Sequence, residues 1–354
     1  MKLLKHSLKA RVFWLLASCL ALLMSSPVSG FQGQKSRTES QSTSTWIIQD
    51  DGEKRRLEIR GKAEFSDDYT DITSVSEGGW VIVEEVHNGQ SRRYEVRRDG
   101  AGQITRAFYL NGAARPLDET SKTWLAKFVL NAVRQGGFDA EKRVKIILAQ
   151  RGVAGVLAEI SQISSDYAKR IYFDQLIKQG NLDAAALRDV LRQAAREITS
   201  DYEQAQLLLA VAPVLTGKDV ALQPFFDAVA TIKSDYERSR VLKKLLQQET
   251  ANSALLVLVA SSTKTISSDY ERRGVLSALA KTKIQSEEVL RMLLDSATQM
   301  SSDYEKATLL VDVSNVYTGD TRLKSAFLKA VETIKSDYER GRVLSVLLKN
   351  KQIG

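Results

Sequence analysis

Apolar residues recur at helical spacing from Glu119 to the end of the chain. One stretch with this pattern begins at Ser234, and its apolar positions are Val241, Leu242, Leu245 and Leu246. Residues three, four and seven apart share one face of an α-helix, so the pattern predicts amphipathic helices that each bury one stripe. We therefore expect residues 118–354 to be helical.

Residues 46–117 alternate between apolar and polar positions instead. In the segment 56–65 the alternation is clean and predicts one half-buried strand; its apolar side is Leu57, Ile59, Gly61, Ala63 and Phe65. Further strands are expected over residues 80–86, 92–98 and 103–110. Turns are expected at Asp51-Gly52, Asn88-Gly89, Asp99-Gly100 and Asn111-Gly112, because these residue types accept the positive φ of tight hairpins. This predicts a small antiparallel meander of about five or six strands, with Trp46, Trp80 and Trp124 in its core and at its junction with the helices.

The helical part carries a short phrase, Ser-Asp-Tyr-Glu, at a fixed interval. It begins at Ser200, Ser234, Ser268, Ser302 and Ser336, and a sixth copy at Ser165 lacks the Glu. The tyrosines are 35 residues apart once and then 34 apart; they are Tyr167, Tyr202, Tyr236, Tyr270, Tyr304 and Tyr338. A fixed period of this length is typical of a solenoid of stacked helix pairs.

The phrase has the residues of a helix start. Taking its Ser as position zero, Ser at zero and Glu at three form a capping box, in which the Ser oxygen accepts the N3 amide and the Glu reaches back to the Ser amide. A second cap is expected near position eighteen of each unit, at Asp183, Asp219, Asn252, Ser286 and Asp320. Each unit is then two capped helices, the second ending near an apolar residue at position 32.

The units predicted in this way are 164–198, 199–232, 233–266, 267–300 and 301–334, followed by a half unit over 335–354. Residues 118–163 are expected to hold a helical junction and a shortened first repeat. The fold class is therefore α+β, mainly α: an N-terminal antiparallel β-meander followed by an α-solenoid of helix-pair repeats of about 34 residues. The period is that of tetratricopeptide repeats, but the residue pattern of that family is missing. In how loosely their residue pattern is defined, the helix pairs are like HEAT repeats.

The first 45 residues are expected to lie outside these folded parts. Four basic residues, an apolar run over 12–24 and small residues over 28–30 predict a secretory signal cleaved near Gly30. An uncleaved anchor and a lipoprotein signal with Cys19 as the attachment site are the alternatives. Residues 31–45 are polar and are predicted to be a flexible linker. We therefore expect a periplasmic or extracellular protein.

Composition removes several kinds of chemistry. Four of the 51 basic residues and none of the 43 acidic ones lie in the signal segment, which leaves a net charge of +4 and argues against nucleic-acid binding. Cys19 is the only cysteine, and His87 is the only histidine beyond the signal segment. Thiolate metal sites and histidine-based catalysis are thereby disfavoured. We expect no cofactor, no metal and no catalytic residue.

Two rows of repeated residues are the candidate binding sites. The first is the tyrosine row, Tyr202, Tyr236, Tyr270, Tyr304 and Tyr338. The second is the basic residue at position four, Arg238, Arg272, Lys306 and Arg340, with Gln204 as the exception. The favoured interpretation of both is structural. The tyrosines are expected to pack against the neighbouring repeat, and the basic row to be solvated and paired with acids of the preceding turn.

Two segments carry a more specific resemblance. Ile232–Arg238 and Ile334–Arg340, behind the strand-like Gly79–Glu85, resemble exported bacterial Ser-Asp-Tyr-Glu repeat proteins, and similar regions occur attached to BlaR-type antirepressor metallopeptidases of the membrane. The resemblance covers about residue 50 to the end. It implies an extracytoplasmic sensing or partner-binding module. No His-Glu-x-x-His helix is present, so no catalytic residue carries over.

These observations together predict a non-enzymatic exported scaffold or sensor accessory at the cell envelope. Its partner is expected to be a protein, including a membrane protein, and the concave face and second helices of the solenoid are the expected contact surface. Self-association through the half unit 335–354 is one alternative. The other is a hydrolase that uses carboxylates of the β domain, although neighbours such as Asp67-Asp68 and Glu84-Glu85 should point to opposite faces of a strand.

Overall fold

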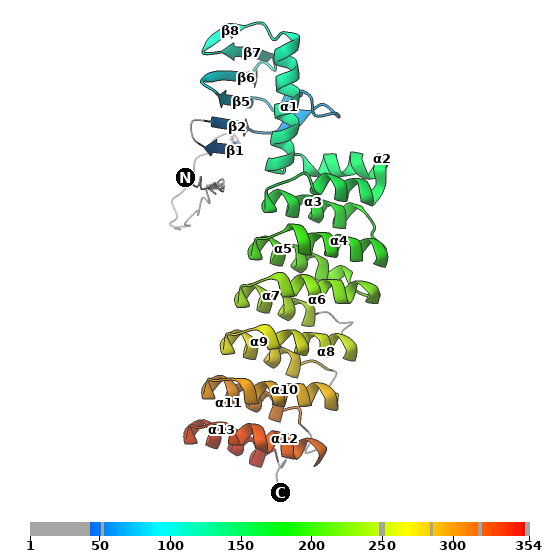
Figure 1. The fold of residues 1–354 in the computed structure, drawn as a ribbon, viewed down its shortest axis with the longest axis vertical. Coiled ribbons are helices and arrows are strands. Elements are labelled where there is room, and N and C mark those ends of the chain that lie inside the picture. Colours follow the sequence, from blue (N-terminus) through cyan, green and yellow to red (C-terminus); the bar gives the residue numbers. More distant parts are fainter. Residues whose placement is uncertain (1–42, 51–52, 248–251, 284–285, 318–320, 351–354) are drawn as a thin grey trace, which may run out of the picture. The chain divides into compact units, whose positions relative to one another are not determined.

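The computed structural model describes residues 43–50, 53–247, 252–283, 286–317 and 321–350. The chain divides into two compact units, one up to Asp139 and one from Ala140 onward (Figure 1). The predicted signal segment, Cys19, most of the predicted linker, the Asp51-Gly52 turn and Asp320 lie outside the described residues. Among the helices that the structure describes, none has the length and apolar character needed to cross a membrane.

The first unit contains an antiparallel sheet, as predicted. Its six strands lie in the order β1-β2-β5-β6-β7-β8, and β3 and β4 form a separate hairpin. The strands are β1 (Thr43–Asp50), β2 (Glu53–Arg60), β3 (Ala63–Phe65), β4 (Ile72–Val75), β5 (Trp80–His87), β6 (Gln90–Arg98), β7 (Ile104–Leu110) and β8 (Ala113–Arg115). Apart from the inserted hairpin, neighbours in the sheet are neighbours in the chain, which makes it a meander.

The single strand predicted over residues 56–65 is wrong. The chain leaves the sheet at Gly61, whose φ of 79° ends β2, and it resumes as β3 in the small hairpin. The alternation continues across the break because Phe65 is still buried, but it is buried in the hairpin, where its ring stacks on Tyr69 at 6.0 Å. Positive φ favours glycine, so Gly61 was the local sign of this break.

One face of the sheet is covered by helix α1 (Glu119–Gly136). A row of cross-strand neighbours forms this face: Trp46, Leu57, Val83, Tyr94 and Phe108. Trp124 and Phe128 of α1 pack on its two ends, with Trp124 at 5.9 Å from Phe108 and Phe128 at 6.1 Å from Trp46. The prediction for Trp46 and Trp124 is thus confirmed.

Trp80 differs from the other two tryptophans. It is only half-buried, and its ring lies beneath the guanidinium of Arg97 at 5.7 Å. The expectation that Trp80 belongs to the core is therefore wrong. It stands at the first position of β5 and pairs across the sheet with Arg97, so a cation covers its ring instead of α1.

Two of the predicted turns have the expected conformation. Asn88-Gly89 and Asn111-Gly112 both have positive φ at each residue, as a two-residue hairpin of the primed type requires. In the turn after β6, Gly102 carries the positive φ and Gly100 does not. Asp99 accepts hydrogen bonds there from the amides of residues 101 and 103, so the side chain of Asp99 builds this turn.

The second unit is an array of helices packed pairwise along the chain, consistent with the predicted α-solenoid (Figure 1). Its first helix, α2 (Ala140–Ile160), is broken at Gly152 (φ 64°, ψ −166°), so it consists of two shorter helices. The following helices are α3 (Asp166–Gln179), α4 (Ala184–Glu197), α5 (Asp201–Val211), α6 (Leu222–Thr231), α7 (Asp235–Leu246), α8 (Ser253–Ser262), α9 (Asp269–Ala280), α10 (Glu287–Gln299), α11 (Asp303–Ser314), α12 (Thr321–Glu332) and α13 (Asp337–Lys349).

These helices lie in two layers. The first helices of the repeats, α3 to α13 by odd numbers, pack on one another, and the second helices, α4 to α12 by even numbers, do the same. One continuous apolar core runs from Ala140 to Leu347 between the layers. Each repeat therefore buries its stripe against its neighbours, as the period predicted.

The second-helix caps are confirmed in three repeats. Asp183, Asn252 and Ser286 each accept the amide three residues on, at 2.7–3.2 Å. The cap predicted at Asp219 is wrong. Asp219 begins a short 3₁₀ turn, and α6 starts after it at Leu222 without a side-chain cap.

Candidate functional site

The repeated Ser is a helix cap in all six copies of the phrase. Its oxygen accepts the backbone amide three residues on at 3.3–3.4 Å, at the start of each odd-numbered helix from α3 to α13. This half of the capping box is confirmed. It satisfies one of the amides that a helix start leaves without a partner.

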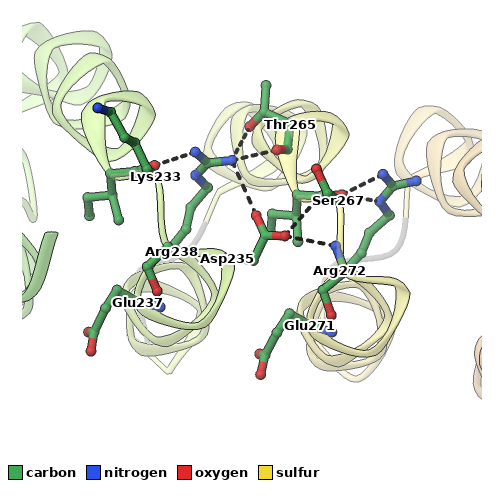
Figure 2. A network of polar contacts seen from close by, with 12 residues as sticks. Lys233, Asp235, Glu237, Arg238, Thr265, Ser267, Glu271 and Arg272 are labelled. Carbon is green, nitrogen blue, oxygen red and sulfur yellow. Dashed lines mark hydrogen bonds and ion pairs between the residues drawn. The ribbon is translucent and has the colours of Figure 1, made fainter.

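The other half of the capping box is wrong, because an Asp of the preceding repeat occupies the Ser amide. Asp235 accepts from the amides of Ser267 at 2.9 Å and Ser268 at 2.8 Å, and Figure 2 shows it reaching the start of the next repeat. The same contact, at 2.7–3.0 Å, is made by Asp166, Asp201, Asp269 and Asp303. We call these residues the Asp staples.

The staple is also reflected in acid strength. The amide of Ser336 is the largest influence on Asp303, and with the amide of Lys335 and the charge of Lys306 it holds the pKa of this carboxyl below its ordinary 3.8. A carboxylate that accepts backbone hydrogen bonds is stabilised in its charged form. The joint between two repeats is therefore tied to an ionised Asp.

The Glu of the phrase forms ion pairs with basic residues. Arg170 donates to Glu203 of the next repeat at 2.5 Å, and Arg273 donates to Glu305 of the next repeat at 2.6 Å. Glu271 pairs with Lys243 of the preceding repeat at 3.5 Å, and Glu339 pairs with Arg342 of its own helix at 2.8 Å. The Glu thus neutralises a basic residue where the sequence placed it on the Ser amide.

The basic residue at position four binds the end of a second helix. Arg238 donates to the carbonyl of Thr265 at 2.6 Å, and Lys306 donates to that of Thr333 at 2.9 Å. Lys169 makes the equivalent bond to Glu197 at 2.6 Å. The last carbonyls of a helix lack partners and carry partial negative charge, so a cation is favoured there.

The expected solvated basic row is therefore wrong for these residues. Arg238 is 7% exposed and Lys306 4%, although each does lie 3.8 Å from the Asp three residues before it, as expected. Arg272 donates to the carbonyl of Ile266 at 2.8 Å, so its charged group is also engaged within the array. Arg340 matches the expectation instead, because its side chain is 39% exposed and pairs with Asp337, three residues before it, at 2.8 Å.

The tyrosines show the opposite departure. Tyr202, Tyr236, Tyr270, Tyr304 and Tyr338 are 53%, 58%, 61%, 56% and 78% exposed. The expectation that they pack against the neighbouring repeat is wrong. Position two of the helix points away from the joint that positions zero, one, three and four build, so each ring stands on the surface at the start of an odd-numbered helix.

An arginine accompanies most of these rings. Arg240 lies 5.8 Å from the ring centre of Tyr236, Arg273 lies 5.2 Å from Tyr270, and Arg342 reaches Tyr304 of the preceding repeat at 5.2 Å. We call the exposed tyrosines and these arginines the tyrosine row. Each of these arginines stands three or four residues after a phrase tyrosine, a spacing that puts both on one helix face and could have identified them from the sequence.

The sheet separates Glu84 from Glu85 as predicted, whereas Asp67-Asp68 lie in the turn between β3 and β4 and not in a strand. Glu84 pairs with Lys54 and Arg56 on one face, whereas Glu85 accepts from Arg55 and from the indole of Trp124 on the face that α1 covers. His87 is exposed in its turn and contacts Glu53. Over the described ranges, no cluster of three or more His, Cys, Asp or Glu side chains could hold a metal ion.

The chain matches no protein-family model, no curated protein and no solved structure among those compared. The geometry of its own repeats is therefore what any functional conclusion has to rest on.

Proposed function

We propose that this protein is an exported, non-enzymatic binding scaffold at the cell envelope whose helical array binds a protein partner through the tyrosine row. Export is inferred from the signal-like segment over residues 1–30. A sensing or partner-binding role is what the resemblance to exported Ser-Asp-Tyr-Glu repeat proteins implies.

One observation carries the proposal: tyrosine is the one member of the phrase that recurs without a place in the joint. Ser caps a helix, Asp staples the next repeat, Glu pairs with an arginine, and the basic residue binds carbonyls. Tyr236, at 58% exposure, does none of these things. A large aromatic side chain kept on the surface in four full repeats and in the half unit favours a contact made several times over by one partner.

The chemistry of the row suits a protein surface. Tyrosine and arginine are the residue types enriched in the energetic centres of protein interfaces, since both bury large area and still form hydrogen bonds. From the sequence, the second helices and a concave face are the expected contact surface. The exposed rings argue instead for the starts of the first helices.

A site-specific photocrosslinking experiment tests the proposal in living cells. A benzoylphenylalanine probe replaces Tyr236 or Tyr270 in the full chain, and a matched probe replaces Val220, which is as exposed as Tyr236 at 58% but lies outside the phrase. We expect one discrete adduct from the tyrosine positions and none from Val220. Equal labelling at Val220, or no adduct at any tyrosine, would remove the tyrosine row as the contact surface.

Self-association is a second candidate that a specific observation favours. The side chain of Asp337, which occupies the staple position of α13, is 97% exposed and pairs with Arg340 of its own helix, whereas Asp303 holds two amides of a neighbouring repeat. Leu348 of the same helix is 62% exposed. The helix start of a second copy could donate two amides to Asp337. Sedimentation velocity across a hundredfold dilution separates this case, since a monomeric scaffold keeps one sedimentation coefficient.

A further inference from the structure

The sheet unit contains a cavity that the tyrosine row does not explain. It lies between β2, β5, β6 and α1 and has a volume of about 440 Å³, within the range of small-molecule sites. The residues of its lining that matter here are Arg55, Glu85, Arg92, Trp124, Lys127 and Phe128. All of them belong to the first unit.

Glu85 organises the polar side of this cavity. It stands on the central strand β5, directly between Arg55 on β2 and Arg92 on β6. Arg55 donates to it at 3.0 Å, Arg92 lies 3.8 Å away, and the indole of Trp124 donates to it at 2.6 Å. One carboxylate thus holds two guanidinium groups at the edge of the cavity.

The charges of the lining do not cancel. Lys127 adds a third cation from α1, so three positive groups surround one carboxylate and leave a formal excess of two positive charges. Each guanidinium has five N–H donors, of which the contact with Glu85 uses few. The cavity therefore offers hydrogen-bond donors and positive potential to a ligand.

The part of the lining that α1 supplies is aromatic. Trp124 and Phe128 lie 5.8 Å apart on one face of α1, and the guanidinium of Arg92 lies 5.9 Å from the Trp124 ring centre. A bare inorganic anion would use only the cations and not the ring surface that lines the cavity. A ligand with an anionic head and a flat apolar body would use both sides.

We propose that this cavity binds a small organic carboxylate, with its carboxylate on Arg55, Arg92 and Lys127 and its apolar part against Trp124 and Phe128. Planar guanidinium groups can match a carboxylate with two parallel hydrogen bonds, and the single bond from Arg55 to Glu85 leaves donors of both arginines for a ligand. This site belongs to the sheet unit alone and does not depend on the proposed function of the array.

Calorimetric titration of the full chain with three probes tests the proposal. Benzoate carries both the carboxylate and a ring, benzyl alcohol carries the ring alone, and inorganic phosphate carries the charge alone. We expect benzoate to bind more tightly than either of the others by tenfold or more. Phosphate binding as tight as benzoate, or no benzoate binding at millimolar concentration, would overturn the proposal.

Arginine variants locate the bound probe. Arg92→Met and Arg55→Met should each weaken benzoate at least tenfold. Arg97→Met is the matched control, because Arg97 also lies on β6 and also covers a tryptophan, Trp80 at 5.7 Å, but does not line the cavity. An equal loss in the control would show that the effect is not local and would refute the site. Arg55 is half exposed, so its variant keeps the test valid if Arg92→Met fails to fold.

A Glu85→Gln variant tests whether the ligand is negatively charged. The amide oxygen can still accept from Trp124, but the competing negative charge is gone. We expect benzoate to bind about three- to tenfold more tightly, and its affinity to fall with added salt. Weaker binding would mean that Glu85 itself contacts the ligand, which contradicts the anion site and would favour the carboxylate chemistry of the hydrolase alternative.

Discussion

Removing one Asp staple should weaken one joint of the helical array. In an Asp235→Ala variant, the amides of Ser267 and Ser268 at the start of α9 lose their acceptor, and Arg238 loses the carboxylate 3.8 Å away. The side chain of Asp235 is only 22% exposed, so water replaces it incompletely. We expect the joint between α7 and α9 to weaken more than a surface substitution would weaken it.

The magnitude follows from three terms. The half-buried bond to Ser268 is charge-assisted and worth roughly 1.5–3 kcal/mol. The exposed bond to Ser267 adds about 0.5 kcal/mol, since water replaces most of it. The negative charge in the first turn of α7 contributes about 0.3–1 kcal/mol through the helix dipole. The expected loss in the free energy of unfolding is therefore about 2–4 kcal/mol.

Asp337→Ala is the matched control. Asp337 occupies the same position of the same phrase, but its side chain is 97% exposed and accepts no amide of another repeat among the described residues. It should lose the dipole contribution and the exposed ion pair with Arg340, together about 1 kcal/mol. Urea unfolding followed by circular dichroism gives both values, and hydrogen exchange of the first turn of α9 locates the loss. Equal losses in the two variants would refute the staple.

Acid should weaken the joint between α11 and α13, where Asp303 is the staple. The pKa of Asp303 is lowered in the folded array, chiefly by the Ser336 amide, so its contribution is fully present above the unfolded value of 3.8 and is lost as pH falls below it. An Asp303→Asn variant keeps the acceptor oxygen but has no titrating group. Its stability should change less between pH 5 and about pH 2 than that of the parent chain. Identical pH profiles would contradict this.

Three further predictions concern other parts of the array. Glu159→Ala should lower the free energy of unfolding in urea by about 3 kcal/mol, because Arg143 loses the carboxylate that lies 2.6 Å away in a buried ion pair across the break in α2. A loss below about 1 kcal/mol would contradict this. Gln204→Lys should stabilise the array by about 1 kcal/mol, because a lysine at this position would reach the Thr231 carbonyl. Gln204 is 1% exposed and occupies the position where other repeats have a cation. A lower melting temperature would contradict this prediction. Tyr270→Ser should change the free energy of unfolding by no more than about 0.5 kcal/mol, as a surface substitution does. The same variant should abolish photocrosslinking from probes at the neighbouring exposed tyrosines. A large loss of stability would show that the ring has a packing role.

Local sequence determined most of the fold. The spacing of apolar residues and the Ser caps predict where the odd-numbered helices start, because a cap depends on an amide only three residues away. The turns at Asn88-Gly89 and Asn111-Gly112 follow in the same way from φ preferences of single residues. Errors arose where the chain left a regular element, at Gly61 in the sheet and at Asp219 before α6.

The candidate site was predicted less well, because its residues interact with groups about 30 positions away. The sequence placed Glu on the Ser amide, but the Asp of the preceding repeat lies closer once the repeats are stacked. It also placed the position-four cations in solvent and the tyrosines in the joint, whereas the structure buries Arg238 and Lys306 and leaves five of the tyrosines exposed. The cavity around Glu85 had no signal at all, since its residues come from three strands and a helix.

The sequence by itself determined the period, the helix pairs, the meander and the scarcity of cysteine and histidine, because these depend on short-range spacing and composition. Only the tertiary structure decided which backbone groups meet at each joint. At about 100° per residue, the apolar stripe at positions seven, eight, eleven and twelve has position four on its side and position two opposite, which fits the burial of Arg238 and the exposure of Tyr236. The carbonyl that Arg238 reaches and the amides that Asp235 holds lie 27 to 33 positions further along the chain, so only the stacking of the repeats brings these groups together.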